Sequence, residues 1–147
     1  MSQTRSSSEP DARHGWCSLR IRFDEREQAL LKGAEQIRGA AYAATPRPDV
    51  LRTALNLARA GHKVAQAHAG ASISLDEPEL RLILDAVRFS TDEVRWASRQ
   101  PEDDRSPRRA TVLQAYPELV ERGAWRGFGL GRELEELSAR LATALNS

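Results

Sequence analysis

The feature of this sequence that most constrains its fold is a change of hydrophobic period close to the N-terminus. Apolar and polar residues alternate strictly over residues 17–23, which is the pattern of a half-buried β-strand. The apolar spacing then becomes three and four residues, as in an amphipathic helix. Asp24 is a favourable N-cap, and Glu27 stands three residues later, where its side chain can complete a capping box. The sequence therefore predicts a short strand over residues 16–23 that runs directly into a helix over residues 25–42.

Length and composition indicate one compact globular unit. A chain of 147 residues buries a substantial core, and its 40% of hydrophobic residues is typical of folded proteins. The polar, serine-rich residues 1–15 lack the apolar run of a signal peptide and are predicted to form a disordered arm. The single cysteine excludes an intrachain disulfide, and no apolar run approaches the roughly 18 residues of a membrane span, so we expect a cytoplasmic protein.

The rest of the chain is predicted to be mostly helical. Two prolines within residues 46–48 end the first helix, and Thr45 or Asp49 is expected to cap the second. The second helix either ends at Gly61 as its C-cap or continues over residues 62–70 for a further turn or two. An acidic capping-box pattern at residues 76–79 begins the third helix. The broad apolar face of the second helix consists of Val50, Leu51, Ala54, Leu55, Leu57 and Ala58. The last three predicted helices span residues 77–98, with a possible break at Ser90 and Glu93, 107–116 and 131–146. The fold class is mainly α, with about five helices and one or two short strands.

A weak internal echo links two parts of the chain. Residues 21–27 resemble residues 73–79 at an offset of 52, with an apolar residue, an acidic cap and a capping glutamate at matching positions. Any extended segment that enters an acid-capped helix has this pattern. The echo therefore reflects either two independent junctions of this common type or a true internal duplication. It leaves open a second short strand over residues 71–75 that could pair with the first.

The last predicted helix has a leucine seam. Its apolar residues recur at alternating spacings of four and three, as in about two heptads of a coiled coil. We expect Leu134, Leu137 and Leu141 either to form a homodimer or partner interface or to pack on the helix over residues 77–98.

Charge is distributed unevenly along the chain. Up to Lys63 there are 11 Lys and Arg against 7 Asp and Glu, a net charge of +4, whereas beyond it the counts are 11 against 14, a net charge of −3. The overall charge of +1 argues against a protein that coats nucleic acid non-specifically. A basic first half suits an electrostatic footprint confined to one end of the molecule.

The order of strand, acid-capped helix, turn and second helix over residues 16–60 resembles the ribbon-helix-helix family of repressors and antitoxins. In that family two protomers each contribute one strand to an antiparallel ribbon that enters the DNA major groove. The resemblance implies that the strand's outward side chains read base edges and that its inward side chains form a dimer core. The implied readers are Ser18, Arg20 and Arg22, the implied dimer-core residues are Leu19, Ile21 and Phe23, and the start of the second helix, with Thr45 and Arg47, is implied to contact a phosphate. This chain departs from the family in its longer first helix and in a turn with two prolines where a Gly-x-Ser connection is expected.

We therefore divide the chain into the arm over residues 1–15, a ribbon-helix-helix-like unit over residues 16–70 and a helical unit over residues 71–147. The preferred function is a dimeric, sequence-specific DNA-binding regulator or antitoxin-like protein whose acidic helical half dimerises or holds a partner. The alternative is a non-enzymatic helical adaptor in which the arginines of the strand are plain surface and protect an edge strand from aggregation.

The sequence does not predict an enzyme, a metal site or a cofactor. His14 and Cys17 supply two potential metal ligands, which do not make a site, and His62 and His68 stand six residues apart and do not share a helical face. The glycine-rich residues 127–131 follow no predicted strand and lack the lysine of a phosphate-binding loop, so they are predicted to form a flexible hinge.

Overall fold

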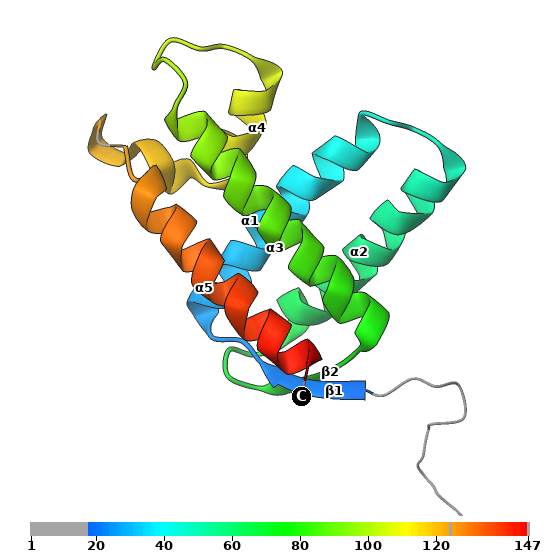
Figure 1. Ribbon diagram of the computed structural model, residues 1–147. Helices are drawn as coiled ribbons and strands as arrows, with labels where there is room; N and C mark the ends of the chain where they lie inside the picture. Colours follow the sequence, from blue (N-terminus) through cyan, green and yellow to red (C-terminus); the bar gives the residue numbers. More distant parts are fainter. Residues whose placement is uncertain (1–17, 124, 147) are drawn as a thin grey trace, which may run out of the picture.

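The computed structural model describes residues 18–123 and 125–146, and the side chains of residues 18–120 and 125–146. The predicted arm, His14 and Cys17 therefore lie outside the described residues. The elements in chain order are β1 (Ser18–Arg22), α1 (Glu25–Ala43), α2 (Pro48–Gln66), β2 (Ser72–Asp76), α3 (Glu77–Ser98), α4 (Pro107–Ala115), the 3₁₀ helix η2 (Pro117–Gly123) and α5 (Gly127–Leu145) (Figure 1). This is the mainly helical fold with two short strands that the sequence predicts.

The two strands form one antiparallel ribbon at one end of the helices (Figure 1). Ile21 of β1 lies opposite Ile73 of β2, so the second strand that the internal echo left open is present and pairs with the first. One face of the ribbon points into the core, where Ile21 and Leu75 are buried. The strand pairing therefore takes place within a single chain.

Each strand runs directly into a helix that begins with a complete capping box. The side chain of Asp24 accepts from the Glu27 amide at 2.7 Å, and that of Asp76 accepts from the Glu79 amide at 2.8 Å. The glutamates accept in return from the amides of Asp24 and Asp76. The offset of 52 residues that relates the two boxes also relates Ile21 to Ile73, which face each other in the ribbon. The two strand-helix units are therefore related by an approximate two-fold axis through this pair.

One further helix completes each unit, α2 against α1 and α5 against α3. Lys63 of α2 pairs with Glu79 at 2.6 Å, and Arg140 of α5 pairs with Glu27 at 2.8 Å. The last helix of each unit thus supplies a cation to the capping glutamate of the other unit. The chain consists of a first unit, β1–α1–α2, and a second unit, β2–α3–α5, into which α4 and η2 are inserted.

The core lies around α3, which contacts α1, α2, α4 and α5. α3 is one continuous helix, without the break considered at Ser90 and Glu93. The buried Ser90 hydroxyl donates to the carbonyl oxygen of Ala34 in α1 at 3.3 Å. The leucine seam packs in this core, where Leu134, Leu137 and Leu141 are buried together with Ile21 and Phe23, while Leu19 is partly buried. The strand that the resemblance assigns to a dimeric ribbon and the leucine seam both find their partners inside one chain.

The start of α2 was predicted wrongly, and its end follows one of the two alternatives that the sequence left open. α2 begins at Pro48 with Arg47 as its N-cap, and neither Thr45 nor Asp49 caps it. The helix continues past Gly61 to Gln66, so Gly61 is not its C-cap. Gly61 instead allows close packing, since a Cβ there would collide with the Glu35 carboxylate of α1.

The start of the last helix is also wrong. α5 begins at Gly127 and not at residue 131, so residues 127–131 form helix and not a flexible hinge. The indole of Trp125 occupies the space that a side chain at position 127 would need. The lack of a side chain at Gly127 therefore lets the Trp125 indole pack against the start of α5.

Candidate nucleic-acid interface

The outward face of the ribbon is polar and carries two arginines. Ser18, Arg20 and Arg22 alternate with inward residues along β1, and all three are exposed. The Arg20 guanidinium lies across the ribbon, where Nε donates to the hydroxyl of Ser72 at 3.2 Å and Nη1 donates to that of Ser74 at 3.3 Å. The two strands thus present one continuous surface of guanidinium and hydroxyl groups.

Arg140 of α5 fixes the end of β1. Its guanidinium donates to the carbonyl oxygen of Arg22 at 2.5 Å and to both carboxylate oxygens of Glu27. It also lies over the ring of Phe23, 5.3 Å from the centroid. The main chain beneath Arg22 is held in place, while its side chain remains exposed.

Acidic side chains border this face where the helices begin. Asp24 and Asp76 are engaged in the capping boxes, and the exposed Glu77 pairs with Arg81 at 2.8 Å. Glu25 is exposed in the first turn of α1. Among residues 18–123 and 125–146, the positive groups on this face are therefore those of Arg20 and Arg22, which form a narrow strip.

The structure does not bring Thr45 and Arg47 to this strip. They lie in the connection after α1, and the 19 residues of α1 span about 27 Å. Figure 1 shows this connection at the opposite end of the molecule from the ribbon. Arg47 instead lies 3.7 Å from Asp49 on an exposed surface. The phosphate contact implied at the start of α2 is thus separated from the ribbon face by the longer first helix.

The outer surface of α2 is unexpectedly apolar. Only Leu57, Ala60 and Val64 of this helix are buried, whereas Leu51 and Leu55 are 45% and 60% exposed. The sequence assigned both leucines to one broad apolar face. Only one narrow face of α2 packs on the core, so these two leucines, which are one turn apart, lie in solvent.

A cluster of ionic groups links α1, η2 and α5. Arg26 pairs with Glu118 and Glu133, at 2.6 Å in each case. The hydrogen bonds from Arg26 lower the pKa of the Glu133 carboxyl. Because one guanidinium bridges carboxylates on two other elements, the cluster holds α1, η2 and α5 together. In the part of the chain that the structure describes, no group of three His, Cys, Asp or Glu side chains could hold a metal ion.

No helix among the described residues has the length and apolar character needed to cross a membrane. No known family model, curated protein or solved structure matches the chain significantly.

Proposed function

We propose that the protein is a sequence-specific regulator that binds duplex DNA by inserting its single-chain ribbon into the major groove. The observation that carries the proposal is the ribbon itself: two antiparallel strands with one face in the core and an exposed face that presents Arg20 and Arg22. A two-stranded ribbon fits the major groove of B-DNA, and arginine donates two hydrogen bonds to guanine there. The approximate two-fold arrangement of strand, capped helix and further helix supports the resemblance to ribbon-helix-helix proteins.

The two-fold arrangement also suggests what kind of site is bound. Under the approximate axis the counterparts of Arg20 and Arg22 are Ser72 and Ser74. A homodimeric ribbon presents the same side chains to both halves of its site, and its operators are palindromic. This ribbon presents arginines from one strand and serines from the other, so the proposed site is asymmetric, with guanines read in one half.

A helical adaptor is the second candidate, and the exposed leucines of α2 favour it. Leu51 and Leu55 form an apolar stripe, and apolar residues in solvent are common at protein interaction sites. In an antitoxin-like protein the two functions coexist, with DNA on the ribbon and a protein partner on the helices.

A binding titration distinguishes these candidates. A specific duplex would first be selected from a random pool, and its affinity measured by fluorescence anisotropy at several salt concentrations. We expect Arg20→Ala and Arg22→Ala each to weaken specific binding by about 1–3 kcal/mol without unfolding the protein. Arg59→Ala is the matched control, because Arg59 is an exposed arginine of α2 and belongs to neither strand of the ribbon. A wild-type protein without affinity for any duplex at low salt would exclude the DNA proposal and leave the adaptor.

A further inference from the structure

A second basic surface lies at the far end of α5 from the ribbon. The last turns of α3 and the first turns of α5 enclose a cavity of about 410 Å³, which we call the basic cleft. Its lining includes Arg95, Arg99, Phe128 and Arg132. The volume falls within the range of small-ligand sites. Because α5 has 19 residues, the cleft lies about 27 Å from the ribbon end of the helix.

The basic cleft has an excess of positive charge. Arg95 pairs with Glu135 of α5 at 2.9 Å. Glu135 is the one carboxylate in the lining of the cleft, and Arg95 engages it. Among the described residues, Arg99 and Arg132 form no ion pair, so the cleft carries more guanidinium groups than carboxylates. The first turn of α5 also contains no acidic residue. Neighbouring guanidinium groups in excess of the nearby carboxylates are suited to phosphate, which they bind through paired hydrogen bonds.

Exposed aromatic rings stand beside these arginines. Phe128 is 85% exposed and lines the cleft, and the 36% exposed Trp125 packs its indole on Gly127 at the same helix start. The apolar ring of Phe128 therefore stays in water although the chain has a well-filled core. An exposed ring next to arginines is the arrangement on which unpaired bases stack in proteins that bind single strands.

We propose that the basic cleft binds a phosphate group together with an unstacked base. Arg99 and Arg132 hold the phosphate, and the Phe128 ring stacks on the base. This chemistry is shared by single-stranded nucleic acid and by a free nucleotide. The inference is independent of duplex binding at the ribbon, because it involves different residues at the opposite end of the molecule.

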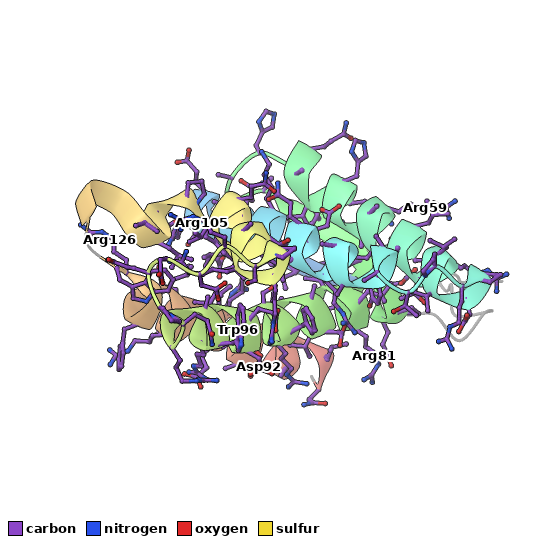
Figure 2. The ribbon with its side chains drawn as sticks, turned by 90° about the horizontal axis from the view of Figure 1, so that it is seen from above. Arg59, Arg81, Asp92, Trp96, Arg105 and Arg126 are labelled. Atoms are coloured by element: carbon purple, nitrogen blue, oxygen red, sulfur yellow. The ribbon has the colours of Figure 1, made fainter. Side chains whose placement is uncertain are left out.

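The test uses the full chain and three probes: a fluorescent single-stranded oligothymidylate, AMP and inorganic phosphate. The double variant Arg99→Ala/Arg132→Ala should weaken oligonucleotide binding at least about tenfold and make it less dependent on salt. The matched control is Arg59→Ala/Arg81→Ala, which removes the same charge, and Figure 2 shows both of these arginines at the end of the molecule opposite Arg126, the residue before α5.

A second pair of variants tests the aromatic contact. Phe128→Ala should weaken the binding of the oligonucleotide and AMP by about fivefold or more, and leave that of phosphate unchanged. Leu55→Ala, which also truncates an exposed apolar side chain, should leave all three unchanged. Tight oligonucleotide binding with weak AMP binding identifies the ligand as a strand, and equal affinities identify a nucleotide. The proposal is overturned if the wild type binds none of the probes, or if the control variants lose as much affinity as the cleft variants. Arg20→Ala should not alter any of these affinities, which separates this result from the ribbon's.

Discussion

The two halves of the molecule have the same scaffold and different surfaces. In both units a strand enters a helix through an aspartate and glutamate capping box, and in both a later helix pairs with the box of the other unit. The ribbon positions that are arginine in the first unit are serine in the second. The features common to both halves therefore stabilise the fold, and the features that differ are the places to look for function.

The last helices of the two units differ in a second respect. α5 buries Leu130, Leu134, Leu137 and Leu141 against α3, whereas α2 buries only three side chains and leaves Leu51 and Leu55 in solvent. The inserted α4 and η2 have no counterpart in the first unit, and α4 packs mainly on α1. We therefore expect the first unit to be the less stable of the two and to be more available to partners.

The largest effect is expected from a charge placed on the inward face of the ribbon. Ile21 is 6% exposed, so Ile21→Asp would bury an unpaired carboxylate and should cost about 3–5 kcal/mol of unfolding free energy. Ile73→Asp changes the half-buried counterpart of Ile21 and should cost about 1–2 kcal/mol of unfolding free energy. Urea denaturation measures both. A stable Ile21→Asp protein would mean that the inward and outward faces of β1 have been exchanged.

The inserted segment departs from the two-fold arrangement at Tyr116, the residue after α4, which contacts α1. The buried hydroxyl of Tyr116 donates to the carbonyl oxygen of Leu30 at 2.6 Å, and its ring fills the space beside Gly33. Tyr116→Phe should therefore cost about 1–3 kcal/mol. Tyr42→Phe is the control, because its hydroxyl makes a longer, exposed bond of 3.3 Å to Asp85. Equal losses in the two variants would argue against a special role for the insertion.

The same tyrosine predicts a dependence on alkaline pH. Burial raises the pKa of the Tyr116 hydroxyl above its ordinary value of 10.0. The unfolded chain then loses this proton at a lower pH than the folded chain, so the stability contribution is complete below about pH 10 and is lost as the pH rises toward the folded pKa. Stability measured from pH 9 upward should fall less steeply in Tyr116→Phe than in the wild type. Parallel curves would contradict the assignment.

Intermediate effects are expected from the two capping boxes. Asp24→Ala and Asp76→Ala should each cost about 0.5–2 kcal/mol, because each removes the acceptor for a helix-terminal amide. Similar losses would support the equivalence of the two units. The double variant should show the sum of the two losses, as expected for sites that share no partner.

The smallest effects concern the two cations that cross between the units. Lys63→Ala should cost less than about 1 kcal/mol, because the pair with Glu79 is partly exposed. Arg140→Ala should cost more, since Arg140 also donates to the Arg22 carbonyl and lies over Phe23. Raising the salt concentration should diminish both losses. A larger loss for Lys63→Ala would reverse the expected order.

Local chemistry made much of this fold predictable. The helix expected over residues 25–42 is present as α1, and α3 begins where Asp76 and Glu79 indicated, because capping boxes and hydrophobic period depend on near neighbours in the chain. Gly61 and Gly127 were misinterpreted because their neighbours, Glu35 and the indole of Trp125, act through space. Helix propensity alone gives no sign of such contacts.

The candidate sites were less predictable for the same reason. The alternation in β1 identified Arg20 and Arg22 as outward-facing, but only the strand register shows that Arg20 reaches the hydroxyls of Ser72 and Ser74. The separation of Thr45 and Arg47 from the ribbon follows from the length of α1, which the sequence already indicated. The basic cleft joins two helices that are distant in sequence, so no local pattern reveals it.

Because both strands of the ribbon belong to one polypeptide, mutation can change each strand independently of the other. In a ribbon made of two identical chains, every substitution appears in both strands, so the two strands cannot differ. Here the two strands are encoded separately, so an arginine can be retained in one strand while a serine occupies its counterpart. The ribbon also needs no encounter between protomers to form, so it persists at any dilution at which the chain stays folded.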